Sequence, residues 1–287
     1  MWWLLALVFS PAWSEQAWSE QAGVQAQAVS ALDRYELGEP SAQWRLPRRL
    51  REISGLAISP AGRLFAHDDE RAVVYEIDFK EGKLLKAWAL GDGAARGDFE
   101  GIAVARGRVW LVTSDGTLFE GPEGADDERV LFNTYGTGVG RNCEVEGLAY
   151  EPNDETLLLV CKTPRVDELR HAVGIYRWSL DERRLVGPMI RIPLADLTEP
   201  VDGDDFSPSG IERDPQTGNY VIVAARQELI AEVTPSGTVV AVKELSRRDH
   251  RQPEGIAFSS DLTLFIADEG AGRRARLTLY APRPRVR

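Results

Sequence analysis

The chain has 287 residues, and its 43% hydrophobic content with eight Trp is enough for a substantial core, which excludes a chain that is disordered throughout. The 45 acidic residues outnumber the 34 Lys and Arg, giving a formal net charge of −11 that argues against nucleic acid or an anionic membrane as a partner. The excess of acid fits a cation ligand, or more simply a soluble surface.

The N-terminal segment is a predicted secretory signal. An apolar run from Trp2 to Phe9 is too short to span a bilayer as a finished helix, and Pro11 and small residues follow it. We expect residues 1–17 to be cleaved on export to the periplasm or the outside, leaving no stable membrane span. No Lys or Arg precedes the run, so an uncleaved anchor is the alternative. Residues 18–30, rich in Ala, Gln and Ser, are predicted to be a flexible spacer before a single domain over residues 31–287.

Five copies of one sequence unit follow the spacer. They read ISGLAIS, FEGIAVA, VEGLAYE, PSGIERD and PEGIAFS, around Gly55, Gly101, Gly147, Gly210 and Gly255. Three of the four intervals are 45 or 46 residues, and the third is 63, which indicates an insertion. Four short strands with their turns need about 45 residues, the size of one propeller blade. The sequence therefore predicts an all-β, five-bladed β-propeller.

The glycine strand of each unit is predicted to be the innermost one. Ala stands two residues after the glycine in four units, and Glu212 takes that place in the fourth. Small residues belong where blades taper toward the axis, so the glycines need no catalytic explanation. The fifth unit has almost no chain left after residue 282 for an outermost strand. We expect the segment between Ala31 and Pro47 to supply that strand beside Arg276–Tyr280 and close the ring.

The five motifs in this order, with CEVEGLAYEP, LLLVCK and LFIADEG, resemble the SdiA-regulated family over about residues 52–280. The resemblance implies a five-bladed β-propeller distantly related to NHL-repeat proteins. It also implies bound calcium, which one member carries. It implies no reaction, since the family has no established activity.

Acidic residues are expected to gather at one mouth of the central channel. The start of the innermost strand and the end of the second strand share one edge of an antiparallel hairpin. The polar residues at these two positions are Glu52, Ser54, Asp68, Asp69, Glu70, Asp98, Glu100, Asp115, Glu144, Glu146, Lys162, Ser209, Arg226, Glu254, Asp268 and Glu269. Converging carboxylates repel each other unless a cation lies among them or some take up protons.

Oxygen-only ligands suit Ca²⁺, which accepts six to eight oxygens in flexible geometry. The candidate ligands are Glu100, Glu146, Glu254, Asp68 and Asp268. Calcium-dependent lactonase-type propellers look similar at the start of the inner strand, where a Glu before Gly binds the metal. This similarity favours Glu100, Glu146 and Glu254 as ligands. Taken singly, each acid is more readily a turn or strand-end cap.

Other residues near the same mouth are candidates for ligand binding. Lys162 and Arg226 stand where other units have acid, so they could receive an anionic group or simply neutralise their neighbours. His67, Asp115 and Glu269 complete the predicted ligand-binding set. His67 and His250 could act as general bases, although lone histidines are more often packing residues.

The two cysteines are predicted to form a disulfide if the protein is exported. The hairpin of residues 144–162 turns near Asn153 and Asp154, which places Cys161 roughly opposite Glu146 and Cys143 diagonal to it. A bridge needs a Cα separation below about 7 Å. Two buried thiols are the alternative.

Three functions fit this sequence. The first is an exported, monomeric calcium-binding propeller that binds a small-molecule or protein ligand at its acidic rim without turnover. The second is a Ca²⁺-dependent phosphoesterase or lactonase-type hydrolase that uses the same rim, although no nucleophile motif is present. The third is an interaction platform in which calcium only stabilises the ring.

Overall fold

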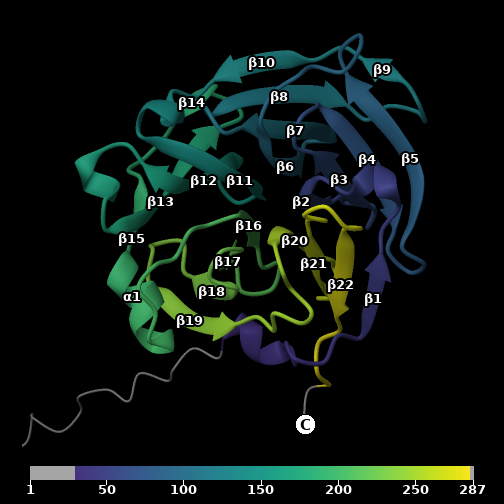
Figure 1. Cartoon of the computed structure of the whole chain (residues 1–287). Helices are drawn as coiled ribbons and strands as arrows, with labels where there is room; N and C mark the ends of the chain where they lie inside the picture. The colour runs from purple at the N-terminus through teal and green to yellow at the C-terminus, as the bar shows by residue number, and fades with distance from the viewer. Residues whose placement is uncertain (1–29, 285–287) are drawn as a thin grey trace, which may run out of the picture.

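The computed structural model describes residues 30–284, which form five antiparallel sheets around one axis (Figure 1). The chain is therefore the five-bladed β-propeller that the repeats predict. The expected signal peptide and all of the expected spacer except Ser30 lie outside the described residues. Within the described residues, no helix is both long and apolar enough to cross a bilayer.

The blades follow one another along the chain. Blade one contains β2 (Ile53–Ile58), β3 (Leu64–Asp68), β4 (Val73–Asp78) and β5 (Lys83–Leu90), with β9 (Arg129–Val130) parallel at its edge. Blade two contains β6 (Phe99–Ala105), β7 (Arg108–Thr113), β8 (Thr117–Pro122) and β10 (Asn133–Gly136). Blade three contains β11 (Cys143–Glu151), β12 (Thr156–Pro164) and β13 (Ala172–Ser179), with β14 (Arg184–Leu185) and β15 (Ile190–Pro193) both paired to β13.

The remaining strands form the last two blades. Blade four contains β16 (Gly210–Arg213), β17 (Tyr220–Ala224), β18 (Leu229–Val233) and β19 (Val239–Glu244). Blade five contains β20 (Pro253–Phe258), β21 (Leu264–Asp268), β22 (Arg276–Tyr280) and β1 (Ala42–Arg45). The long third interval holds β15 and the short helix α1 (Leu194–Thr198). The 3₁₀ turns are η1 (Ala31–Arg34), η2 (Arg48–Leu50), η3 (Val139–Arg141), η4 (Asp167–Leu169) and η5 (Glu199–Val201).

The glycine strands β2, β6, β11, β16 and β20 are the innermost strands and surround the axis (Figure 1). A Cβ atom on Gly101 would lie 2.5 Å from the backbone nitrogen of Leu148 in the next blade. One on Gly210 would lie 2.5 Å from the carbonyl oxygen of Glu254. A larger residue would force neighbouring blades apart, so the repeated glycine is a packing requirement.

Apolar side chains fill the spaces between neighbouring sheets. Between blades one and two, the buried rings of Phe65 and Trp88 meet edge to face at 5.3 Å between centroids. Phe99 and Leu111 of blade two belong to the same buried cluster. Each sheet therefore has apolar side chains on both faces, because each face lies against another blade.

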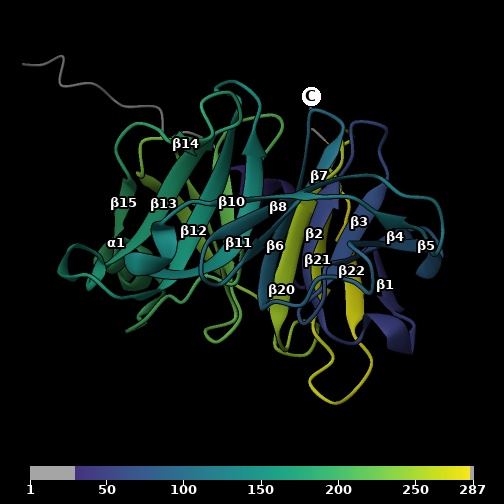
Figure 2. The same cartoon turned by 90° about the horizontal axis from the view of Figure 1, so that it is seen from above.

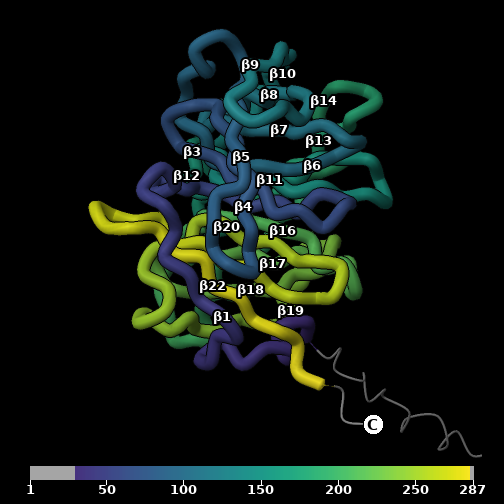
Figure 3. The backbone as a smooth tube through the Cα atoms, turned by 90° about the vertical axis from the view of Figure 1, so that its right-hand side faces the viewer, coloured from purple at the N-terminus to yellow at the C-terminus, as the bar shows by residue number. Residues whose placement is uncertain are grey.

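The ring closes through β1, as the sequence predicts. β1 pairs antiparallel with β22, with Trp44 opposite Leu277, and forms the outermost strand of blade five. In Figure 3 the purple segment of β1 runs beside the yellow β22. The pairing covers the outer edge of β22, which would otherwise expose unpaired backbone groups.

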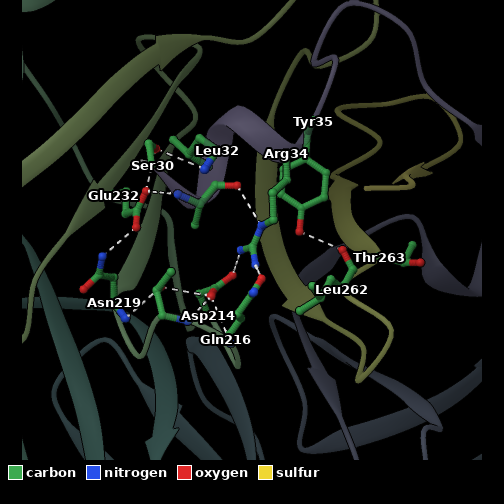
Figure 4. A network of polar contacts seen from close by, with 12 residues as sticks. Ser30, Leu32, Arg34, Tyr35, Asp214, Gln216, Asn219, Glu232, Leu262 and Thr263 are labelled. Carbon is green, nitrogen blue, oxygen red and sulfur yellow. Dashed lines mark hydrogen bonds and ion pairs between the residues drawn. The ribbon is translucent and has the colours of Figure 1, made fainter. Parts of the chain in front are cut away.

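A buried polar network attaches the segment before β1 to blade four (Figure 4). Glu232 on β18 is fully buried and accepts hydrogen bonds from Ser30 Oγ at 2.5 Å, the Ala31 backbone nitrogen at 2.6 Å and Asn219 Nδ2 at 2.6 Å. Arg34 forms an ion pair with the buried Asp214. Ser30, the last residue of the expected spacer, is thus a hydrogen-bonded part of the propeller.

Replacing Glu232 by Ala should lower the free energy of unfolding by about 2 kcal/mol, because two buried donors and one partly buried donor lose their acceptor. Urea unfolding of both proteins measures this difference. Asp33→Ala is the matched control, since Asp33 is on the same segment but exposed, and Lys243 is its one ion-pair partner among residues 30–284. It should change stability by less than about 0.5 kcal/mol. Equal effects of the two substitutions would contradict the anchoring role.

Candidate functional site

A cavity of about 180 Å³ lies at the mouth of the channel where the inner strands begin. Glu100, Glu146 and Glu254, from blades two, three and five, all line it, as the repeat pattern predicts. The other residues that line it are Glu52, Ser54, Asp69, Lys162, Gln252 and Glu269. Six carboxyl groups therefore surround this cavity with one ammonium group.

A β-bulge explains why the residue before the glycine reaches the cavity in blades one, two, three and five. In β2, β6 and β20 the pairing register shifts immediately before the glycine, and Ser54, Glu100 and Glu254 have no partner across the hairpin. β11 shows a similar shift between Val145 and Leu148, which contains Glu146. A bulged residue leaves the ordinary alternation of the strand, so its side chain can be turned toward the axis.

The second strand of the hairpin also contributes a residue to the cavity. This second position is the residue that directly follows the one paired near the start of the inner strand. Asp68 is paired with Ile53, and the next residue, Asp69, lines the cavity. Blade five repeats this arrangement, since Asp268 is paired with Pro253 and Glu269 lines the cavity. In blade three the same position belongs to Lys162.

Asp68 and Asp268, two of the predicted metal ligands, are not among the residues that line the cavity. Asp68 Oδ1 accepts hydrogen bonds from the backbone nitrogens of Glu70 and Arg71 at 3.1 and 3.0 Å. Asp268 Oδ1 accepts from the backbone nitrogens of Arg251 and Gln252 at 2.7 and 3.1 Å. Both aspartates therefore cap turns. They do not share the cavity with the residues that follow them, because consecutive side chains of a strand point to opposite sides.

Asp115 and Arg226 also lie outside the lining of the cavity. The hairpin register puts Ser114 at the second position in blade two, because the backbone nitrogen of Ser114 bonds to the Asp98 carbonyl. Asp115 instead accepts hydrogen bonds from Thr113 Oγ1 at 2.6 Å and from the Thr117 backbone nitrogen at 3.0 Å, within a turn. The sequence interpretation was one residue out of register, since the bulge cannot be counted from the sequence.

The two histidines near this mouth are both fully buried. Burial lowers the pKa of His67 to about 4, and a Cβ atom on Gly55 would lie 2.6 Å from its Nε2 atom. His250 Nδ1 is 2.9 Å from Asp268 Oδ2, and its Nε2 is 2.8 Å from the Tyr280 hydroxyl. Neither histidine lines the cavity, and both are packed into blades.

The carboxyl groups of the cavity have raised pKa values. Burial, and then the charge of Glu146, raise the pKa of Glu254 to about 8. Burial, followed by the charges of Glu146, Asp98 and Glu254, raises the pKa of Glu100 well above its usual range. Burial and the charge of Asp68 raise the pKa of Asp69 to about 6. The cavity therefore holds protons or partial charge at neutral pH when no cation is present.

Lys162 compensates part of this charge. Its Nζ lies 2.9 Å from Glu146 Oε1. Burial alone would lower the pKa of Lys162, but Glu146, Glu254 and Glu100 together raise it. Burial still keeps the pKa of Glu146 above its usual value, because one ammonium group is shared among several carboxylates.

The donor chemistry of the cavity suits a hard cation, because every potential ligand that lines it except Lys162 offers oxygen. Within residues 30–284, no three His, Cys, Asp or Glu side chains stand close enough together to hold one metal ion as they are. A shared cation would require the glutamate carboxyl groups to come closer together and to compete with Lys162 for Glu146.

Gln252 is the one lining residue that the sequence interpretation missed. It donates a hydrogen bond to Glu269, and it stands three residues before Gly255, as Glu52 does before Gly55. The signal for it was this position in the repeat, not its residue type. Counting repeat positions instead of acidic residues would have found it.

Cys143 and Cys161 form a disulfide with a Cα separation of 5.6 Å, at the end of the β11–β12 hairpin. The bridge adjoins the cavity, because Cys161 directly precedes Lys162 and pairs with Val145, the residue before Glu146. The bridge joins the ends of β11 and β12, which carry Glu146 and Lys162.

The model of the SdiA-regulated family matches residues 41–271, which include every strand of the five blades except β22. The chain belongs to the SdiA-regulated family. No curated protein is similar enough in sequence to match it. Among the solved structures, this family member is similar to glutaminyl cyclase from Myxococcus xanthus, with a TM-score of 0.58 and 16% identity over 84% of this chain and 94% of that one.

It is also similar to the PQQ-bound aldose sugar dehydrogenase from Streptomyces coelicolor, with a TM-score of 0.53 and 15% identity over 84% of this chain and 97% of that one. At these identities, both similarities show the fold alone. They therefore leave the function to be argued from the cavity itself.

Proposed function

We propose that the protein is an exported β-propeller that binds Ca²⁺ in the axial cavity and holds a small-molecule or protein ligand at that mouth. The observation that carries this proposal is the convergence of Glu100, Glu146 and Glu254, which occupy the same bulged position in three blades. Packing of the glycine strands does not explain these carboxylates, since Ser54 and Ser209 occupy the same position in the other two blades.

Electrostatics support a cation in this cavity. Buried carboxylates that face each other must take up protons or share a positive ion, and their raised pKa values report the cost of ionising them without one. Ca²⁺ fits better than Mg²⁺ because its coordination geometry is flexible, whereas Mg²⁺ needs a near-ideal octahedron. Glutamate side chains from three separate blades can satisfy the flexible coordination of Ca²⁺ more easily than a strict octahedron.

Replacing Glu254 by Gln should weaken Ca²⁺ binding at least about tenfold, because outer-shell changes alone cost about 10–100-fold in metal affinity. Isothermal titration calorimetry with CaCl₂ measures the affinity. Glu212→Gln is the matched control. Burial raises the pKa of Glu212 to about 8, but this residue lines a separate cavity, with Tyr150 and Phe258, at the opposite mouth. Its substitution should leave the affinity unchanged.

Lys162→Met provides a test in the opposite direction. Removing the ammonium group frees Glu146 and raises the negative potential of the cavity, so Ca²⁺ should bind more tightly than to the unmodified protein. Equal Ca²⁺ affinities in all four proteins, or no measurable Ca²⁺ binding, would overturn the proposed site.

A Ca²⁺-dependent phosphoesterase or lactonase-type hydrolase is the second candidate function. The observation that favours it is Lys162, whose partly buried ammonium could stabilise negative charge that develops on a substrate. The cavity volume of about 180 Å³ argues against an enclosed substrate site, since small-molecule sites usually measure about 300–1,000 Å³. Calcium-dependent hydrolysis of a phosphoester or lactone that Lys162→Met abolishes would favour the enzyme.

A further inference from the structure

A second cavity, of about 410 Å³, lies on blade five beside the axial cavity. The two cavities share Glu269 in their walls. Their charges are opposite, because five arginines line the second one: Arg45, Arg251, Arg273, Arg274 and Arg276. This is a concentrated positive site in a chain of net charge −11.

Carboxylates neutralise these arginines only in part. Within residues 30–284, none of the five forms an ion pair with an acidic side chain. The two acids in the cavity wall already have other partners. Asp268 accepts from backbone nitrogens and from His250, and Glu269 accepts from Gln252. Asp268, which stands opposite Arg276 in the β21–β22 register, and Glu269 offset only part of the charge of five arginines, so the cavity keeps an excess of positive charge.

The pairing of β1 with β22 adds a like-charge contact. Arg45 stands directly opposite Arg276 in the register of these two strands. Like charges at directly opposed positions destabilise an antiparallel pair. Ring closure does not require this contact, because the apolar pair of Trp44 and Leu277 lies at the next position. An anion between the two guanidinium groups would turn their repulsion into attraction.

Two of the guanidinium groups are held in place by backbone carbonyl groups. Arg274 Nε donates to the Leu46 carbonyl at 2.7 Å, and Arg276 Nη1 donates to the carbonyls of Arg248 and Asp249, both at 2.9 Å. These neutral acceptors orient the groups without cancelling their charge. Arg273 and Arg274 belong to the β21–β22 loop, which projects from this end of blade five (Figure 2).

We propose that this arginine cavity binds a small, multiply charged oxyanion of the phosphate-ester class. The planar guanidinium group donates paired hydrogen bonds that match phosphate and carboxylate oxygens. A volume of about 410 Å³ lies in the range for small-molecule sites, about 300–1,000 Å³, and exceeds what one inorganic phosphate fills. The net charge of the whole chain disfavours a long polyanion, so the ligand is small. This site is independent of the proposed calcium.

Calorimetric titration of the full chain with pyrophosphate, in EDTA at constant ionic strength, tests this proposal without calcium. We expect saturable binding that Arg45→Gln and Arg276→Gln each weaken at least about tenfold. Arg191→Gln is the matched control. Arg191 also donates to a backbone carbonyl, that of Glu168, and has no ion-pair partner within the described residues, but it lies on β15 in blade three. This variant should bind like the unmodified protein.

Two further measurements distinguish a built site from solvated surface arginines. Without an anion, Arg45→Gln should raise the melting temperature because it removes the repulsion with Arg276, and pyrophosphate should raise it only in proteins that keep both arginines. Citrate in place of pyrophosphate decides between the two oxyanion classes, and the proposal requires the weaker response to citrate. No pyrophosphate binding, or an equal loss in Arg191→Gln, would overturn it, whatever the outcome for calcium.

Discussion

Calcium at a thousand times its dissociation constant is expected to raise the free energy of unfolding by about 4 kcal/mol. The physical reason is that the folded ring brings Glu100, Glu146 and Glu254 together, whereas the unfolded chain separates them. Only the folded state then gains from a shared cation. Urea unfolding at several calcium concentrations and in EDTA measures the gain, which should grow with the logarithm of the calcium concentration.

The same carboxyl groups should make the calcium-free protein less stable as the pH rises from about 5 to about 9. Their pKa values are higher in the folded state than in the unfolded chain, reaching about 6 for Asp69 and about 8 for Glu254. The folded protein therefore holds protons that the unfolded chain releases above about pH 4.5. Stability that is present below that pH is lost as the pH passes through the folded pKa values.

Saturating calcium should reduce this loss, because the metal then takes the place of the protons and binds better once they have left. Glu254→Gln should flatten both the pH dependence and the calcium response, whereas Glu212→Gln should flatten only the pH dependence. Glu123 does not obscure this pH range, because its hydrogen bond with Arg63 lowers its pKa to about 2. An unfolding curve indifferent to calcium and EDTA at pH 8 would reject the metal site.

Removing the disulfide should lower the free energy of unfolding by about 3 kcal/mol. Cys143 and Cys161 are 18 residues apart, and a bridge over a loop of this length restricts the unfolded chain while the folded hairpin keeps its geometry. Urea unfolding of the disulfide-bonded protein and of the reduced protein measures the loss. Double replacement of both cysteines by Ala should give about the same result.

The bridge should also affect the cavity, because it joins the strand ends that carry Glu146 and Lys162. We expect the Cys-to-Ala protein to bind Ca²⁺ more weakly than the oxidised protein, while it remains folded. Equal stability of the oxidised and reduced forms would show that the bridge does not constrain the hairpin.

The architecture of this protein could be predicted from its sequence because it repeats. Five glycine motifs, separated by four intervals of which three are 45 or 46 residues, determine five blades, since a glycine is required where inner strands approach too closely for a Cβ atom. The missing outer strand of the fifth unit likewise predicts that β1 closes the ring. The recurrence of Glu before Gly in three units was sufficient to identify Glu100, Glu146 and Glu254 as neighbours.

Only the tertiary structure decided which of the other charged residues meet. A bulge before the glycine offsets the hairpin register in blades one and five, so Asp69 and Glu269 line the axial cavity while Asp68 and Asp268 cap turns. The arginine cavity could not be read from the sequence at all, because Arg45 and Arg276 become neighbours only when the ring closes. Local patterns determine strands and their spacing, whereas contacts between distant segments depend on register and closure, which are properties of the whole ring.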